Sequence, residues 1–133
     1  MVDEFRVALE RALVEADGDD RIGPLICATK LRLRFVFTDI DLELNLASSE
    51  DEHRLRWSFG APPWEPKLTL TMSSAVANRY LLGRESLAIA IARGEVRVRG
   101  ESRAALLYLP AARLIGEPYR RVVESGFPAL AAA

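Results

Sequence analysis

The sequence predicts an α+β fold in which a five-stranded sheet carries helices over one of its faces. Two observations lead to this prediction. Five short segments alternate apolar with polar residues, the pattern of a strand that buries one side, and they begin at Leu31, Leu42, Leu55, Leu68 and Val96. The segments around them repeat apolar residues at intervals of three and four, the spacing of a helix that buries one side.

Length and composition limit the class of protein. With 133 residues, half of them hydrophobic, the chain is expected to form one domain, residues 1–133, whose core needs neither disulfides nor metal. A net charge of −1 argues against non-specific nucleic-acid binding. The apolar neighbours of the single cysteine, Cys27, predict a small buried side chain in a reducing compartment. No apolar run could span a bilayer and no secretory leader is evident, so we expect a soluble, cytoplasmic protein.

The first element expected is an amphipathic helix over Val2–Ala16, which ends at the turn cluster Asp17–Asp20. The face that this helix buries consists of Phe5, Leu9, Ala12, Leu13 and Ala16. The following segment, Ile22–Thr29, contains a Gly-Pro pair and fits either a loop or a short helical turn. The pattern leaves both possibilities open.

Residues 30–59 predict three strands, each with one buried face. The apolar positions of the first two strands are Leu31, Leu33, Phe35 and Phe37, and then Leu42, Leu44 and Leu46. After a polar loop over residues 48–53, those of the third strand are Leu55, Trp57 and Phe59. Because side chains alternate between the two faces of a strand, each of these sets is expected to point to the same side of the sheet.

The turn near Asp39 and Ile40 decides the register of the first two strands. A connection of even length sets apolar residues opposite apolar ones, whereas an odd length would set them opposite polar ones. Even parity therefore predicts the pairs Phe37 with Leu42, Phe35 with Leu44 and Leu33 with Leu46. The same register brings Arg34 within diagonal reach of Glu43, a pair worth about 0.2–1 kcal/mol.

A proline-rich segment, Gly60–Pro66, is expected to cross from these strands to a fourth strand over Leu68–Met72. Trp64 within the segment is too large and apolar to be left in water. It either seals the core, the reading that we favour, or rims an opening.

The helix after the fourth strand is expected to be capped by Ser73 or Ser74 and to end at Gly83 in the left-handed conformation. The next segment, Leu87–Ala92, is apolar on every side. A surface helix cannot have that character, so the segment is placed either inside the fold or under a lipid-like ligand.

The C-terminal third begins with a strand over Val96–Gly100 whose valines are expected to point inward, and Ser102 offers a cap for the next helix. That helix is expected to be cut by Pro110. A last short helix is expected over Tyr119–Ser125. Two apolar residues beyond it are expected to fold back on the core, Phe127 and Leu130.

Several local features of the second half occur together: a strand that ends in Thr71-Met72-Ser73, a helix that closes at Leu82-Gly83, the short apolar helix, and a strand framed by Gly94 and Gly100. In this combination the chain resembles the sterol carrier protein 2 family of lipid-binding domains, over Leu31–Leu109. The resemblance implies a mostly antiparallel sheet, with the fourth strand beside the first and the fifth at the edge. It also implies helices packed on one face around an apolar tunnel for an acyl chain, fatty acyl-CoA or sterol.

The search for catalytic chemistry finds no phosphate-binding loop and no metal-ligand spacing. His53 lies in a charged loop that favours a solvated side chain, and the apolar setting of Cys27 would leave its thiol unreactive. Turn chemistry accounts for Asp39 and Asp41, and an acidic loop for Glu50–Glu52. We therefore expect no enzyme activity, no cofactor and no metal.

What remains is apolar surface on the sheet and on the helices that face it. These side chains could fill one another's gaps at native density, but the resemblance favours a ligand site. The residues expected to line it are Phe35, Phe37, Trp57, Phe59, Leu70, Met72, Tyr80, Leu81, Leu87, Ile91 and Leu106.

The expected function is non-catalytic binding, with or without transfer, of a fatty acid, fatty acyl-CoA, sterol or isoprenoid. Burial of each methylene is favourable by itself, so the head group needs no specific anchor. The alternative is a packed interaction or dimerisation domain that assists a partner enzyme, as the resemblance also implies through a factor in ubiquinone biosynthesis. A partner protein or a homodimer is compatible with both hypotheses, nucleic acid with neither, and membrane contact would be at most transient.

Overall fold

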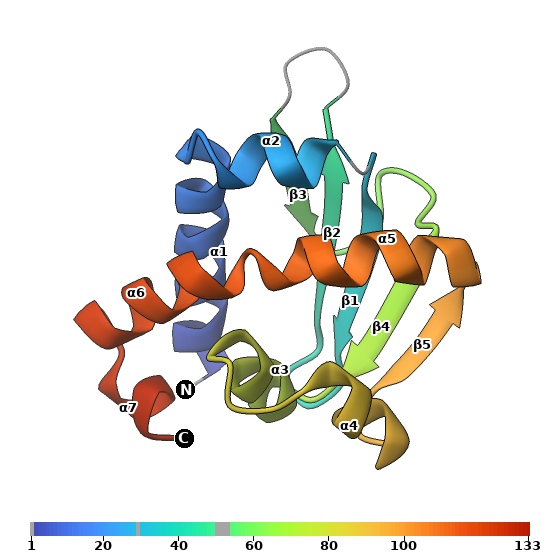
Figure 1. Ribbon diagram of the computed structural model, residues 1–133. Helices are drawn as coiled ribbons and strands as arrows, with labels where there is room; N and C mark the ends of the chain where they lie inside the picture. The colour runs from blue at the N-terminus through green and yellow to red at the C-terminus, as the bar shows by residue number, and fades with distance from the viewer. Residues whose placement is uncertain (1, 29, 50–53) are drawn as a thin grey trace.

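The computed structural model describes residues 2–28, 30–49 and 54–133 (Figure 1). In these residues the chain has the expected α+β architecture, with one sheet and helices over it. The elements in chain order are α1 Val2–Gly18, α2 Ile22–Cys27, β1 Arg32–Phe37, β2 Leu42–Ser48, β3 Leu55–Phe59, β4 Leu68–Met72, α3 Ser74–Leu81, α4 Leu87–Ala92, β5 Arg97–Gly100, α5 Ser102–Arg113, α6 Gly116–Gly126 and α7 Pro128–Ala132.

The five strands form one sheet in the order β3-β2-β1-β4-β5. β1 and β4 are parallel, and the other three neighbouring pairs are antiparallel. The prediction of a mostly antiparallel sheet, with the fourth strand beside the first and the fifth at the edge, is confirmed.

The register of β1 and β2 is the one that turn parity predicts. Phe37 lies opposite Leu42 and Leu33 lies opposite Leu46. The same register continues into β3, where Trp57 lies opposite Leu46, so the inner side chains of the three strands share one face. The predicted diagonal ion pair between Arg34 and Glu43 also forms.

The buried face of the sheet is the one that the helices cover (Figure 1). α1 is closely packed there: its Phe5 ring meets Phe37 edge-on, with ring centroids 5.1 Å apart, and lies 6.2 Å from the ring of Tyr119 on α6. Phe37 in turn stacks on Phe35 at 6.0 Å. These rings join the sheet, the first helix and a C-terminal helix into one core.

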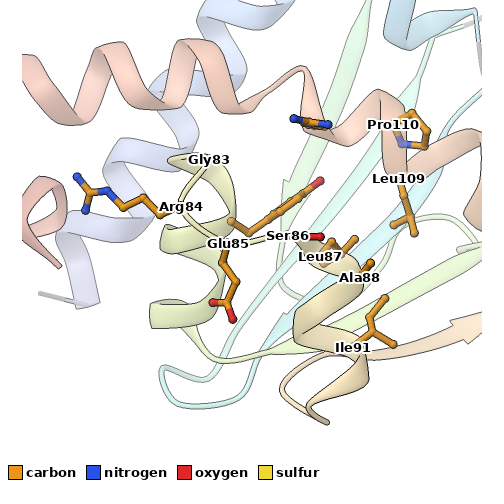
Figure 2. Close-up of a pocket in the computed structure, with 11 residues that line it drawn as sticks. Gly83, Arg84, Glu85, Ser86, Leu87, Ala88, Ile91, Leu109 and Pro110 are labelled. Carbon is orange, nitrogen blue, oxygen red and sulfur yellow. The ribbon is translucent and has the colours of Figure 1, made fainter.

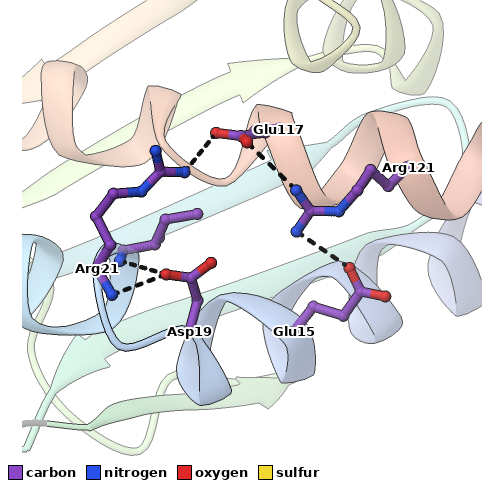
Figure 3. A network of polar contacts seen from close by, with 6 residues as sticks. Glu15, Asp19, Arg21, Glu117 and Arg121 are labelled. Carbon is purple, nitrogen blue, oxygen red and sulfur yellow. Dashed lines mark hydrogen bonds and ion pairs between the residues drawn. The ribbon is translucent and has the colours of Figure 1, made fainter.

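Ion pairs and capping bonds between α1, α2 and α6 surround this core at the surface (Figure 3). Glu117 on α6 pairs with Arg21 at 3.0 Å and with Arg121 at 3.3 Å, and Arg121 also reaches Glu15 on α1 at 3.6 Å. Asp19 accepts a hydrogen bond from the Ile22 N–H, and this bond, the largest of several causes, lowers the pKa of Asp19. Exposed pairs of this kind contribute little each. The segment for which the sequence left both a loop and a helical turn open is the helix α2, and Asp19 caps its first N–H.

Gly100 is the last residue of β5, and a residue with a side chain would not fit at this position. Its φ of +134° lies outside the range of side-chain-bearing residues, and a Cβ atom would lie 2.2 Å from the Lys67 carbonyl oxygen. The glycine at the end of this strand is therefore a steric requirement of the edge pairing between β4 and β5.

Three helix boundaries differ from the sequence prediction. α5 continues through Pro110 to Arg113, with Pro110 at an exposed position of the helix, so the lost backbone donor of the proline does not end it. α5 is preceded by Glu101 as its N-cap, not by Ser102. α6 begins at Gly116, earlier than the predicted Tyr119.

The predicted start and end of α3 are confirmed. Ser73 is the N-cap of α3, and its hydroxyl accepts a hydrogen bond from the Val76 N–H at 3.2 Å. Gly83 ends that helix with a φ of +77°. At the C-terminus, Phe127 and Leu130 fold back on the core as predicted.

Trp64 does not join the core as a seal. Its ring lies 5.6 Å from the guanidinium carbon of Arg56, whose position in β3 alternates away from the inner-facing Trp57. The proline-rich segment therefore places Trp64 against the face of the sheet that the helices leave open. A cation over an aromatic ring is favourable and accounts for this position.

Candidate functional site

The apolar layer between sheet and helices contains a small hollow, here called the interior cavity. Its volume is about 20 Å³, room for a single water-sized molecule. Apolar side chains from α1, three strands, α3 and α5 surround it, together with one tyrosine. The lining residues are Leu9, Leu13, Phe35, Phe37, Leu44, Met72, Ala77, Tyr80, Leu81, Ala112 and Ile115.

A larger hollow, here called the groove, opens between the α3–α4 segment and α5 (Figure 2). Its volume is about 700 Å³. One part of the wall is apolar and comes from α4 and α5, and another part is polar and comes from the loop before α4 and the end of α5. The lining residues are Tyr80, Gly83, Arg84, Glu85, Ser86, Leu87, Ala88, Ile91, Leu109, Pro110 and Arg113.

Tyr80 belongs to the walls of both hollows. Burial raises the pKa of the Tyr80 hydroxyl, and the positive charge of Arg113 partly offsets this rise. The hydroxyl is therefore neutral at physiological pH and can donate a hydrogen bond. Val76 and Ala77 lie four and three residues before Tyr80 on the same face of α3 and are buried, so this face of the helix packs on the core and carries Tyr80 with it.

The residues expected to line a ligand site divide into three groups. Phe35, Phe37, Met72, Tyr80 and Leu81 surround the interior cavity. Two more expected residues lie with Tyr80 in the groove, Leu87 and Ile91. The remaining four border neither hollow, namely Trp57, Phe59, Leu70 and Leu106. Within this last group Leu70 is fully buried and Leu106 is 78% exposed on α5.

Some lining residues were not anticipated. Leu9 and Leu13 of α1 face the interior cavity, and so does Ala112 of α5. The spacing of α1 does mark its two leucines as buried, but no local pattern says which part of the core a helix will cover. Arg113 in the groove had no sequence signal, because it ends a helix that was expected to stop at Pro110.

The composition of α4 placed it either inside the fold or under a lipid-like ligand, and the structure shows that it does not lie inside the fold. Ala90 is its one buried residue, whereas Ile89 and Ile91 are 50% and 37% exposed. The interior cavity is closed by α1, α3, α5 and the sheet without any residue of α4. Other elements therefore occupy the interior, and α4 lies at the surface, where it forms part of the groove wall.

Within the described part of the chain, the charged residues around the groove are paired with one exception, Arg113. Glu85 accepts from Arg79 at 2.9 Å and lies 3.7 Å from Arg93, while Arg79 also reaches Glu95 at 3.3 Å. Arg84 donates to the carbonyl oxygens at the end of α7, including that of Ala133 at 2.8 Å. These contacts tie the loop before α4 to its neighbours on both sides.

A buried polar network lies behind the groove at the junction of α3, α6 and α7. The Tyr119 hydroxyl donates to the Asn78 side-chain oxygen at 2.7 Å, and the Asn78 amide donates to the Leu130 carbonyl at 3.0 Å. Both side chains are almost fully buried, and burial raises the pKa of Tyr119 far above its usual value. The network satisfies its own groups and offers nothing to a ligand.

The turn aspartate Asp39 has a role that the sequence did not reveal. Its carboxylate accepts hydrogen bonds from the N–H and the hydroxyl of Ser74, each at 2.7 Å. Partial burial alone would raise the pKa of Asp39, but these two bonds outweigh it and hold the pKa below the usual value of 3.8. The carboxylate therefore fastens the start of α3 to the turn between β1 and β2.

The described residues give no support for a metal site or for a membrane-spanning helix. Among them no three His, Cys, Asp or Glu side chains are grouped so that they could hold a metal ion. His53, the acidic loop Glu50–Glu52 and the side chain of Cys27 lie outside the described part of the chain. Over that same part, none of the helices combines the length and apolar character needed to cross a bilayer.

Comparison with known proteins finds similarity of structure. No family model and no curated protein matches the sequence. A solved structure of sterol carrier protein 2 covers 86% of this chain and 94% of its own, with a TM-score of 0.61 at 14% identity. A conserved hypothetical protein of Thermus thermophilus, described as a candidate sterol carrier protein, covers 87% and 86%, with a TM-score of 0.62 at 15% identity.

Two further structures are similar over smaller parts. The ubiquinone synthesis protein UbiJ-SCP2 matches 68% of this chain and 73% of its own, with a TM-score of 0.52 at 22% identity. The sec-alkylsulfatase Pisa1 of Pseudomonas sp. matches 73% of this chain, with a TM-score of 0.54 at 16% identity, but this chain spans only 13% of the enzyme's length. All four likenesses lie at identities that show a common fold and no more.

Proposed function

We propose, on the premise that this chain has the fold of sterol carrier protein 2, that it binds a hydrophobic ligand without transforming it. The ligand would be a fatty acid, fatty acyl-CoA, sterol or isoprenoid, held in the apolar layer between sheet and helices by one domain that extends over residues 1–133. The observation that carries this proposal is that Tyr80 lines both an apolar interior cavity and an open groove.

The interior cavity must widen to accept such a ligand. Pockets for small molecules commonly have about 300–1,000 Å³, which the groove of about 700 Å³ reaches and the interior cavity of about 20 Å³ does not. A ligand would therefore settle in the groove and push its apolar part past the Tyr80 ring. Each methylene moved from water into apolar surroundings contributes about 0.8 kcal/mol, which can offset the displacement of side chains.

The part of the fold best suited to move is α4 with the loop before it. This helix fully buries one residue, Ala90, and packs Leu87 partly against the core, while ion pairs of Glu85 and Arg93 hold the segments that flank it. Elements with little buried apolar surface open at the lowest free-energy cost. By contrast, α1, α3 and α5 contribute buried residues to the core and would keep the remaining walls in place.

The test is a titration of delipidated protein with a fluorescent fatty-acid analogue, followed by displacement with unlabelled palmitate. We expect saturable binding and full displacement, together with lipid carried through purification in native mass spectrometry. If no long-chain lipid, acyl-CoA or isoprenoid binds, the carrier function is excluded and the packed interaction domain takes its place.

A pair of matched variants shows whether the lipid enters the interior. Ala112→Leu adds bulk to the wall of the interior cavity, whereas Ala75→Leu makes the same exchange on the exposed side of α3. We expect the first variant to weaken binding and the second to leave it unchanged. Circular dichroism of both confirms that they are folded.

A further inference from the structure

We propose that the groove holds the oxyanion head of a single-chain amphiphile, a carboxylate or a phosphate, and that Arg113 is its anchor. This inference rests on the proposed function and narrows its ligand from any hydrophobic molecule to an acidic one. It also replaces the expectation that the head group needs no anchor.

The first reason is the uncompensated charge of Arg113. Among the described residues no carboxylate lies within 4.0 Å of its guanidinium, and no hydrogen-bond acceptor contacts it. The other arginine in the groove wall, Arg84, is engaged with the carbonyl oxygens of α7. Arg113 is close enough to Tyr80 for its charge to act on the pKa of that hydroxyl, so the charge lies at the boundary between groove and interior.

The second reason is that the polar groups facing the groove are donors without acceptors. The Tyr80 hydroxyl has no protein partner within the described chain, and Ser86, which precedes α4, makes no capping bond with its own helix. A guanidinium can only donate, and the two hydroxyls are free to do so. A group that accepts hydrogen bonds and carries negative charge is the kind of partner that each of these donors lacks, and such bonds are stronger than those to a neutral group.

The single carboxylate of the groove wall does not oppose an anion. Glu85 is 11% exposed in its side chain and is neutralised by Arg79 and Arg93. The opposite part of the wall consists of apolar side chains from Leu87, Ile91 and Leu109. An acidic head at Arg113 therefore continues into a chain that meets apolar surface at once, which describes an amphiphile better than a free anion.

The test compares palmitate, hexadecyl phosphate and hexadecanol, which share one alkyl chain and differ in the head group. We expect the two anions to bind at least about tenfold more tightly than the alcohol, as suits a charge-assisted hydrogen bond. The ranking of palmitate against hexadecyl phosphate identifies which oxyanion the groove prefers. Added salt should weaken the anions and leave the alcohol unchanged.

Arg113→Gln should bring the anions to the affinity of the alcohol, and Arg113→Lys should keep part of the preference. The matched control is Arg103→Gln, which removes one exposed arginine from the same helix outside the groove and should change nothing. If all three lipids bind the unmodified protein equally and Arg113→Gln has no effect, the anchor is refuted while the proposed function stands. If none of the lipids binds, both are refuted.

Discussion

The two ends of the helical layer are held in different ways. At one end α1 packs on α6 and α6 on α7, and Phe5, Tyr119 and Val123 are almost fully buried there. At the other end α4 fully buries Ala90 alone, with Leu87 only partly buried against the core, and ion pairs of Glu85 flank the helix. The first end has the character of a core and the second that of a surface element. Stability should therefore reside in the α1–α6–α7 end, and ligand-dependent movement in the α4 end.

The largest effect is expected at the core end from Tyr119→Ala. This substitution removes a fully buried ring and leaves the Asn78 side-chain oxygen without its donor. We expect the free energy of unfolding to fall by about 3–5 kcal/mol, measured by urea denaturation. Tyr119→Phe keeps the ring and should cost about 1–3 kcal/mol; a cost near zero for both would show that this end does not hold the fold.

A direct contrast between core and surface comes from Leu33→Ala and Ile91→Ala. Leu33 is completely buried in β1, and its truncation should cost about 2–5 kcal/mol because a cavity is left behind. Ile91 is 37% exposed at the groove and should cost clearly less. Thermal melting curves of the two variants measure the difference. Equal losses would mean that α4 is as much a part of the core as the sheet.

Tyr80→Ala tests the boundary between the two regions. The ring borders open space on the groove side, so its removal should cost less stability than Leu33→Ala and should appear mainly in lipid affinity. Lipid titrations and melting curves of the same preparations separate the two effects. Tyr80→Phe serves as the control, because it keeps the ring and loses only the hydroxyl. A variant that melts like Leu33→Ala with unchanged affinity would place Tyr80 in the core.

The smallest effect is expected from Asp39→Ala, which releases the start of α3 from the sheet. Loss of a helix cap costs about 0.5–2 kcal/mol. Because the pKa of Asp39 is lowered in the folded protein, this stabilisation is present above the unfolded-state pKa and disappears as the pH falls through the lowered value. Denaturation curves should therefore differ from the unmodified protein at neutral pH and converge in strong acid. Asp20→Ala, at an exposed turn, is the control.

Side chains of the candidate site that lie on strands could be predicted from the sequence more reliably than those that lie on helices. Phe35, Phe37 and Met72 are set by strand alternation, and the structure places all three around the interior cavity. Leu106 was included because it belongs to an apolar run, yet it is exposed on the outer side of α5. A helical residue turns inward or outward according to where its helix crosses the sheet, and that crossing is not encoded in the spacing of a short apolar segment.

The amino-acid sequence by itself determined the existence of the five strands, the buried faces of β1 and β4, and the register of β1 with β2. Steric alternation along a strand and the parity of a turn act over a few neighbouring residues, so a local pattern is sufficient to specify them. It also determined Ser73 as the cap of α3 and Gly83 as its end. It did not determine the buried face of β5, which is exposed throughout: Val98, expected to point inward, is 38% exposed.

Only the tertiary structure decided the rest. α4 lies on the surface because α1, α3 and α5 already close the core, and Asp39 finds its partner Ser74 through the pairing of β1 with β4. Arg113 faces a groove because α5 continues past Pro110 on its solvent side. Each of these outcomes depends on contacts between segments far apart in the chain, whose free energies are set by the space that the other elements leave.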